Sequence, residues 1–269
     1  MPQSVYGEGY RGSAPENYER YFVPAIGRPV ATDLVTTAGL RPGERVLDVA
    51  CGTGIAARLA AEQVAPGGHV AGLDINPGMI AVARAAAPPE RSIQWYEAPA
   101  EQMPLEDASF DVALCAMGLQ FFSDREAGLR EMDRVLVSGG RAVLNLPGPI
   151  PPLFAVFEDG LTRHVGPEAA GFASMVFSLH DPDEIRSLVR AGGFDDVEIA
   201  ADTKSLRVPP PDQFLWQYIH ATPLAGMLEA IDEERRAALE RDVCSGWEAY
   251  VDDGGLKLDV RMTTVVATH

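Results

Sequence analysis

The sequence contains few cysteines and few basic residues. Cys51, Cys115 and Cys244 are the only cysteines in 269 residues, too few and odd in number for a disulfide framework, and none is spaced like a metal site. Only 22 residues are basic against 39 acidic ones, so the formal net charge is −17 at pH 7. So acidic a chain repels phosphate backbones. We therefore expect a protein of a reducing compartment that uses neither a bound metal nor a nucleic acid.

Long hydrophobic runs are missing as well. No uninterrupted apolar run is long enough to span a membrane. The N-terminal stretch MPQSVYGEGYRGSAPENYERY has no basic segment followed by an apolar core, so it is not typical of a signal peptide. Hydrophobic residues still make up 46% of the chain, enough to bury a core. These features predict a cytoplasmic globular protein without a membrane span.

Strand and helix patterns alternate along most of the chain. Because parallel strands need helical crossovers, we predict an α/β fold: a doubly wound, mostly parallel, seven-stranded Rossmann-like sheet with helical lid insertions. Capping patterns at Asn76-Pro77, Ser123-x-x-Glu126 and Asp181-Pro182 mark helix starts. The predicted strands are RVLDVA (45–50), HVAGLDI (69–75), SIQWYEA (92–98), FDVALCAM (110–117), GRAVLNL (140–146), FDDVEIAA (194–201) and LKLDVRMTTVVAT (256–268).

Two segments interrupt this alternation. Residues 147–180 contain no clear strand, and residues 203–255 contain PPPDQF followed by a helical pattern. Both follow late strands, so we expect them to fold over the ligand-binding edge as a lid, with packing on the flank of the sheet as the alternative. The predicted division is an N-terminal helical cap (1–40), a binding core (41–146), a lid (147–180), a continuation of the core (181–202), a second helical insert (203–255) and a final strand (256–269).

A glycine loop follows the first predicted strand. The stretch RVLDVACGTGIAARLA (45–60) leads from a buried strand into glycines and then a helix, and GTGIAA fits the pattern G-x-G-x-x-A. Asp74 follows Gly54 by 20 positions, where a dinucleotide fingerprint has an acid. By itself the loop fits NAD, FAD or S-adenosylmethionine.

Asp48, near the end of the first strand, helps to separate these ligands. A dinucleotide places a pyrophosphate on backbone N–H groups at a helix N-terminus. S-Adenosylmethionine has no phosphate and brings an amino acid head, a sulfonium cation and a ribose. An acid four residues before Gly52 suits a cationic ligand and does nothing for a pyrophosphate. The alternative role for Asp48 is to cap a neighbouring loop.

Four stretches then occur in a characteristic order: VLDVACGTG, GLDINPGMIAVAR, APAEQMPLEDASFDVALCAMGLQFF and LREMDRVLVSGGRAVL. Together they resemble the class I S-adenosylmethionine-dependent methyltransferases. Within that class the chain is similar to the small-molecule "type 11" branch and to ubiquinone/menaquinone-biosynthesis C-methyltransferases. The resemblance covers residues 40–146 and implies S-adenosyl-L-methionine as cofactor, with S-adenosyl-L-homocysteine as product.

The resemblance also implies contacts with the cofactor. The backbone of Ala50, Gly52 and Gly54 is expected to wrap the methionine moiety, because small residues let the chain approach the ligand. Asp74 is expected to bind the ribose hydroxyls, and Asp48 lies at the cationic end. The remaining implied contacts are Ile75 and Met79 against the adenine, Ala100 and Glu101 at the adenine edge, the carbonyl of Cys115 near the ligand amino group, and Gln120.

Two further positions qualify this assignment. The family usually has an Asp immediately before Ala100, whereas this sequence has Pro99, so Glu101, a water or packing alone must replace that contact. The stretch ENYERYFVPAIGRPV matches the family's leading helix, which closes over the cofactor. Tyr18 and Tyr21 are three residues apart on one face of it, and Tyr21 is the candidate contact for the methionine carboxylate. Core packing is the alternative for Tyr21.

The motifs do not specify the methyl acceptor. Methyl transfer from a sulfonium is an in-line displacement that depends largely on positioning, and an O- or C-acceptor can need a general base. His164 and His220 are the candidate bases, and His180 is a further histidine outside the motifs. The stretch QFLWQYIH is expected to line an apolar acceptor pocket or to pack in the core. We expect metal-independent O- or C-methylation of a small hydrophobic or aromatic metabolite.

Two alternatives from other classes are kept. An NAD-dependent oxidoreductase would bind NADH and would not bind S-adenosylmethionine. A cofactor-binding protein without transferase activity would bind S-adenosylmethionine and methylate nothing; Pro99 is the sequence feature that favours it.

Overall fold

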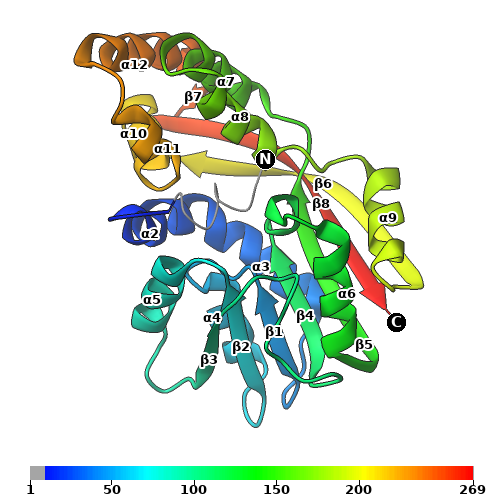
Figure 1. Ribbon diagram of the computed structural model, residues 1–269. Coiled ribbons are helices and arrows are strands. Elements are labelled where there is room, and N and C mark those ends of the chain that lie inside the picture. Colours follow the sequence, from blue (N-terminus) through cyan, green and yellow to red (C-terminus); the bar gives the residue numbers. More distant parts are fainter. Residues whose placement is uncertain (1–9, 269) are drawn as a thin grey trace.

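A computed structural model of the chain describes residues 10–268. In this part of the chain an eight-stranded sheet carries helices on both faces (Figure 1). The strand order is β3-β2-β1-β4-β5-β8-β6, with β7 paired to β8 outside this path. The strands are β1 (Arg45–Val49), β2 (His69–Asp74), β3 (Ile93–Glu97), β4 (Phe110–Ala116), β5 (Leu136–Pro147), β6 (Asp196–Val208), β7 (Val251–Asp252) and β8 (Gly255–Thr268).

The pairing confirms the predicted doubly wound, mostly parallel sheet. The first five strands run parallel, whereas β8 is antiparallel to both β5 and β6. The sheet has one strand more than the seven predicted, and this additional strand is the two-residue β7. β1 lies inside the sheet between β2 and β4, where its apolar side chains, Val46, Leu47 and Val49, are buried. Strand order reverses between β1 and β4, and ligands of such sheets bind outside the carboxyl ends of the strands at that reversal.

Three of the helices that flank this sheet, α5, α6 and α9, begin at capping side chains. Asn76 caps α5 and Asp181 caps α9, as the sequence predicts. The cap of α6 is Asp124 and not the predicted Ser123, because the Ser123 hydroxyl donates a hydrogen bond to Glu101 instead. The flanking helices are α3 (Arg28–Ala38), α4 (Ile55–Gln63), α5 (Pro77–Ala86), α6 (Arg125–Val135) and α9 (Pro182–Ala191).

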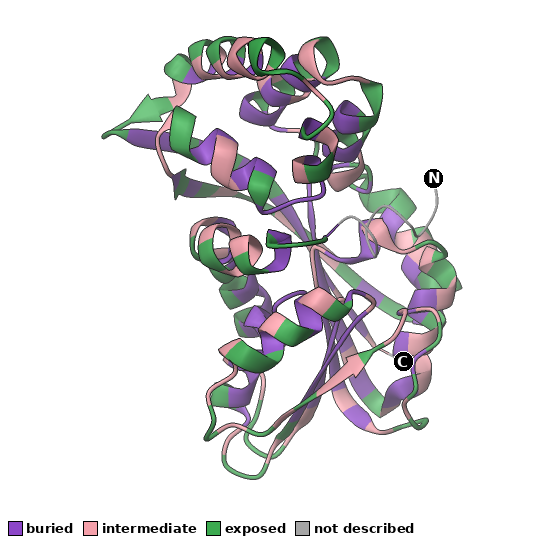
Figure 2. Cartoon of the chain, turned by 60° about the vertical axis from the view of Figure 1, so that its left-hand side comes forward, coloured by how far each residue is buried: buried purple, intermediate pink, exposed green. Residues whose placement is uncertain are grey.

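A group of helices, here called the cap, stands over the carboxyl edge of the parallel strands (Figure 1). Its buried side chains, among them Phe157, Phe214 and Trp247, form one apolar cluster. Figure 2 shows buried residues both along the strands and on the inner sides of the cap helices. The cap consists of α7 (Pro152–His164), α8 (Pro167–Val176), α10 (Pro211–His220), α11 (Leu224–Leu228), α12 (Glu233–Trp247) and η3 (Glu248–Tyr250). The N-terminal elements are α2 (Ala14–Asn17) and the π-helical η1 (Tyr18–Gly27), and the short η2 (Leu119–Phe121) follows β4.

Strands β6 and β8 join the core to the cap. They pair without interruption from Asp196 opposite Thr268 to Val208 opposite Leu256, whereas β8 pairs with β5 only from Met262 onward. The far half of this ribbon therefore leaves the core sheet and packs against the cap cluster. β6 runs to Val208, so the expected helical insert 203–255 begins as strand, because alternate side chains of this stretch are buried under the cap.

Some features are absent from residues 10–268. No helix in this range is long and apolar enough to cross a membrane. The same residues contain no group of three or more His, Cys, Asp or Glu side chains arranged to hold a metal ion.

Candidate active site

The loop between β1 and α4 passes through three residues with left-handed backbone. The φ angle is 54° at Ala50, 55° at Gly52 and 81° at Gly54. A residue with a side chain, such as Ala50, is uncommon in this region, and such positions cluster at functional sites. Asp74, at the end of β2, accepts a hydrogen bond from Gly52 N at 2.8 Å and fixes the loop. The loop thus presents its backbone where the strand order reverses.

The two glycines of the loop have different physical roles. A Cβ on Gly54 would lie 2.3 Å from Cη2 of Trp95, so this position must be glycine for the indole ring of β3 to pack beneath the loop. A Cβ on Gly52 would lie 3.8 Å from the nearest atom, a ring carbon of Tyr18, at ordinary contact distance. Gly52 is therefore required by its φ angle, and Gly54 by both its φ angle and the tryptophan.

Two buried carboxyl groups lie beside the loop. Asp48 and Asp74 are each 1% exposed. Asp48 Oδ2 accepts a hydrogen bond from Ala57 N at 2.8 Å, and Asp74 Oδ1 accepts one from Asn76 N at 2.8 Å. Burial raises the pKa of Asp48 to about 7 and that of Asp74 to about 6. A cation placed beside them would favour the ionised forms.

A cavity of about 70 Å³ lies above this loop and beneath the cap. It brings together residues from η1, β1, β4, α8 and α10 that are far apart in the sequence. The lining residues are Tyr10, Tyr18, Phe22, Gly27, Asp48, Ala50, Cys51, Gly52, Ile55, Ala56, Ala116, Met117, Gln120, Phe121, Phe172, Val176, Tyr218 and Thr222. We call this space the loop cavity.

A second cavity of about 40 Å³ shares Ala50 and Phe121 with the loop cavity. It contains most of the predicted adenine side of the site: Asp74, Ile75, Ala100 and Glu101. Glu101 Oε1 accepts three hydrogen bonds, from Ser123 N, Ser123 Oγ and Asp124 N. The adenine contact expected of Glu101 would compete with these bonds and stays a prediction.

Gln120 supplies an unused polar atom to the loop cavity. Its side chain is 3% exposed, and Nε2 donates a hydrogen bond to Met117 O at 2.9 Å, which fixes the orientation of the amide. Oε1 is then buried without a hydrogen-bond partner among the described residues. An unpaired buried acceptor costs about 1–3 kcal/mol, so this atom favours a ligand that donates a hydrogen bond here. Asn145 supports the arrangement, since its Oδ1 accepts from Met117 N at 3.0 Å.

The N-terminal helices cover the loop cavity and are held by a partly buried ion pair. Glu19 Oε1 accepts a hydrogen bond from Arg58 Nη2 at 2.7 Å, and Glu19 Oε2 accepts from Thr53 Oγ1 at 2.5 Å. The Arg58 side chain is 8% exposed, and its Nη1 also donates to Thr53 O. These contacts tie η1 to the glycine loop. Sequence reasoning missed them, because charges that lie 39 residues apart leave no local pattern.

The other predicted cofactor residues are placed less uniformly. Tyr18 lines the loop cavity and stacks on Phe22 at 4.5 Å between ring centroids, whereas Tyr21 lies in a separate small pocket against α10. Met79 is buried among Tyr10 and Ala14 and does not line either cavity. Cys115 is fully buried, and burial raises the pKa of its thiol to about 12, so the thiol stays protonated. The role proposed for its carbonyl stays a prediction.

The structure does not bring the candidate histidine bases to the loop cavity. His164 Nε2 lies 2.8 Å from Asp242 Oδ2, between α7 and α12. His220, at the end of α10, is exposed and lines a groove on the outer side of the cap. His180 Nδ1 lies 2.9 Å from Phe177 O. None of the three lines either cavity of the site.

The fold and site define a Rossmann-like protein that binds an adenosine cofactor at the carboxyl edge of its sheet. A family model described as a methyltransferase domain matches residues 47–144. Demethylmenaquinone methyltransferase of Deinococcus radiodurans is 37% identical over 163 residues, covering 56% of this chain and 67% of that protein. Nocamycin O-methyltransferase of Saccharothrix syringae is 30% identical over 247 residues, covering 84% and 86%. The chain belongs to the class I S-adenosylmethionine-dependent methyltransferases, and S-adenosylmethionine is its cofactor.

Other similar proteins match this chain over less of their own length, or share only its fold. Ubiquinone/menaquinone biosynthesis C-methyltransferase UbiE of Stenotrophomonas maltophilia is 44% identical over 111 residues, but the chain spans only 44% of that protein. A putative methyltransferase from an antibiotic biosynthesis pathway of Anabaena variabilis has a TM-score of 0.62 at 18% identity, covering 92% of this chain and 98% of that one. At that identity the likeness concerns the fold.

The side chains of the site fit this cofactor. The unpaired Gln120 Oε1 can accept a hydrogen bond from an ammonium group, and Asp48 and Asp74 line the two cavities; their expected contacts with the sulfonium and the ribose hydroxyls stay predictions. In this site a pyrophosphate would meet two buried acids. These acceptor groups therefore favour S-adenosylmethionine over a dinucleotide.

Proposed function

We propose that the protein transfers a methyl group from S-adenosylmethionine to a small apolar or aromatic molecule, at an oxygen or a carbon atom. The observation that carries the proposal is an apolar pocket of about 40 Å³ that adjoins the loop cavity. Phe22, Met117, Val176 and Tyr218 line both spaces. An acceptor bound there would lie next to the cofactor.

The composition of this pocket supports an apolar acceptor. Its lining residues are Phe22, Ile26, Val30, Met117, Pro147, Phe154, Val176, Phe177, Tyr218, Leu258, Val260 and Met262. The hydroxyl of Tyr218 is the one polar side-chain group in that set. Such a wall binds a molecule by removing its apolar surface from water and penalises a charged acceptor, whose hydration would be lost without replacement.

Tyr218 is the residue that we propose orients the acceptor. Its hydroxyl has no hydrogen-bond partner among residues 10–268, and burial raises its pKa above the ordinary tyrosine value. A phenol with a raised pKa stays protonated and donates a hydrogen bond. Tyr218 would thus hold an acceptor oxygen by donation and would not act as a base.

The chemistry needs little beyond this geometry. The cofactor supplies a methyl group on a sulfonium and leaves as neutral S-adenosylhomocysteine, and the O–H or C–H proton of the acceptor would pass to solvent. The chain has to align the acceptor and keep bulk water from the sulfonium. The cap helices and η1 close the space, and Tyr218 with the apolar wall would set the acceptor's direction. The proposal assigns no role to His164 or His220, because neither lines the pocket.

The proposal is tested in two stages. Calorimetry should show that S-adenosylhomocysteine binds and that NADH does not. Release of S-adenosylhomocysteine from S-adenosylmethionine should then be measured with 1-naphthol and reduced 1,4-naphthoquinone, and with glycine as a polar amine. Product is expected with the apolar acceptors only. Turnover confined to glycine would contradict the proposed acceptor class, and failure of both sulfur ligands to bind would contradict the cofactor.

A further inference from the structure

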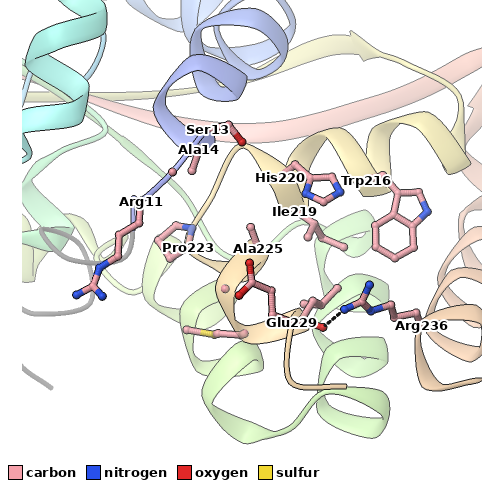
Figure 3. Close-up of a pocket in the computed structure, with 14 residues that line it drawn as sticks. Arg11, Ser13, Ala14, Trp216, Ile219, His220, Pro223, Ala225, Glu229 and Arg236 are labelled. Carbon is pink, nitrogen blue, oxygen red and sulfur yellow. Dashed lines mark hydrogen bonds between the residues drawn. The ribbon is translucent and has the colours of Figure 1, made fainter. Parts of the chain in front are cut away.

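A groove larger than either cavity of the site lies outside the proposed active site. It has a volume of about 740 Å³, within the range of small-molecule pockets, and lies between the residues before α2, α10, α11 and the start of α12 (Figure 3). It shares no lining residue with the loop cavity: Tyr218 and Thr222 face the cavity, whereas Ile219 and His220 face the groove. The end of α10 therefore separates two spaces.

One wall of the groove offers a flat aromatic surface. Trp216 and His220, one turn apart on α10, lie with ring centroids 6.1 Å apart and planes inclined by 30°. Both rings face the groove in Figure 3, with Ile219 beside them. Neither ring is buried. Such a surface suits a planar ring, which stacks on an indole with a gain beyond the area that it buries.

An arginine adds a positive charge next to this surface. The Arg236 guanidinium points into the groove below Trp216 (Figure 3). Nη2 donates a hydrogen bond to Leu228 O at 2.9 Å, Nε is buried without a hydrogen-bond partner, and no carboxylate pairs with the group among residues 10–268. In a chain of net charge −17, an unpaired guanidinium in a groove indicates a site for an anion.

The remaining charged groups limit where that anion can lie. Arg11 belongs to the groove lining, but its guanidinium points away from the aromatic wall in Figure 3. Glu229 is exposed at the end of the groove that α11 forms, and its carboxylate would repel an anion bound there. The favourable place is therefore the end formed by Arg236, Trp216 and His220.

We propose that this groove binds a planar aromatic anion, with its ring against Trp216 and its carboxylate or sulfonate at Arg236. The proposal does not depend on the proposed methyl acceptor, because the ligand would bind across α10 from the cofactor. It assigns a second ligand site to the cap.

The test uses two fluorescent probes that differ in one charged group. 1-Anilinonaphthalene-8-sulfonate is an aromatic anion, and N-phenyl-1-naphthylamine is the same ring system without the sulfonate. Each is titrated in the presence of saturating S-adenosylhomocysteine, which occupies the cofactor site. Arg236→Gln should weaken binding of the sulfonate about tenfold and leave the neutral probe unchanged. Arg241→Gln, the same change at an exposed position of α12, is the matched control and should alter neither.

Two further variants locate the ring and the opposing charge. Trp216→Leu should weaken both probes, and Glu229→Gln should tighten the sulfonate several-fold. Equal affinities of the sulfonate for the Arg236→Gln and Arg241→Gln proteins would overturn the proposal, and so would a neutral probe that binds as tightly as the sulfonate. Binding of S-adenosylhomocysteine is measured separately, so its absence would contradict the proposed function and leave the comparison of the two arginine variants valid.

Discussion

Asp48 and Asp74 show what burial does to single residues of the site. Burial is the main cause of their raised pKa values, about 7 and about 6, and backbone N–H groups that donate to the carboxyls, one to Asp48 and three to Asp74, oppose the shift. In the ligand-free protein both groups hold protons at a pH at which the unfolded chain has lost them. They therefore reduce the free energy of unfolding as pH rises from about 4 to about 7. A bound cation reverses this by favouring the ionised carboxylates.

Binding of S-adenosylmethionine is accordingly expected to depend on pH. The role expected of Asp48 beside the sulfonium requires the ionised carboxylate, so the dissociation constant should fall as pH rises from 5.5 to 7.5, by up to about tenfold per unit below the pKa of Asp48. Asp48→Asn should flatten this dependence between pH 6.5 and 7.5, whereas Glu62→Gln, on the exposed side of α4, should keep it. Calorimetry measures all three. A wild-type affinity that does not change over this range would rule out the role given to Asp48.

The glycine loop shows how far sequence reasoning reaches at this scale. The loop and both acids follow from a local motif and Gln120 from the family resemblance, and the structure places them around one pair of cavities. The physical reason for Gly54 did not follow, because Trp95 comes from a strand two positions away in the sheet. The choice between Tyr18 and Tyr21 also depends on how η1 winds over the cavity. Periodicity places the two rings on one face and does not distinguish them.

At the scale of elements, the N-terminal helices act as a cover held by the Glu19–Arg58 ion pair. Arg58 lies on α4 directly after the glycine loop, and Glu19 lies on η1 beside Tyr18. The two cavities beneath hold about 70 and 40 Å³ of free space, far less than a pocket that encloses a ligand of this size. We therefore expect that the cover must be displaced for the cofactor to enter, and that the ion pair resists this displacement.

Glu19→Gln is expected to loosen the cover. The substitution removes one charge from a pair whose arginine is almost fully buried, so the free energy of unfolding should fall by about 1–3 kcal/mol. Dissociation of S-adenosylhomocysteine, followed by stopped-flow fluorescence, should become several-fold faster. Glu16→Gln, at an exposed position of α2, removes the same charge without touching Arg58 and should change neither quantity. Identical dissociation rates for the two variants would contradict a cover held by Glu19.

At the scale of the whole molecule, the ribbon of β6 and β8 joins two apolar clusters. Leu258 and Val260 of β8 belong to the cap cluster. Val265 and Ala267 of the same strand belong to a second cluster, here called the core cluster, which also contains Leu47 of β1. The sequence predicted both strands, but it assigned residues 203–255 to a separate helical insert. Alternation in a polar stretch such as ADTKSLRV is too weak to show that a strand continues.

The shared strand predicts that the cap and the core unfold together. Phe157→Ala in the cap and Leu47→Ala in the core each remove a fully buried side chain and should cost about 2–5 kcal/mol. Because β8 transmits the loss to both clusters, calorimetry should show one transition at a lower temperature for each variant. Two separate transitions in the Phe157→Ala protein would show that the cap unfolds independently.

The packing of Trp95 under Gly54 has a spectroscopic consequence. The chain has three tryptophans, and each marks a different region: Trp95 the underside of the glycine loop, Trp216 the outer groove, and the buried Trp247, whose Nε1 donates to Leu153 O at 2.8 Å, the cap. Replacing two of the three with phenylalanine leaves one indole whose emission reports a single region. The protein thus carries its own fluorophores for the cofactor loop, the groove and the cap, without an attached dye.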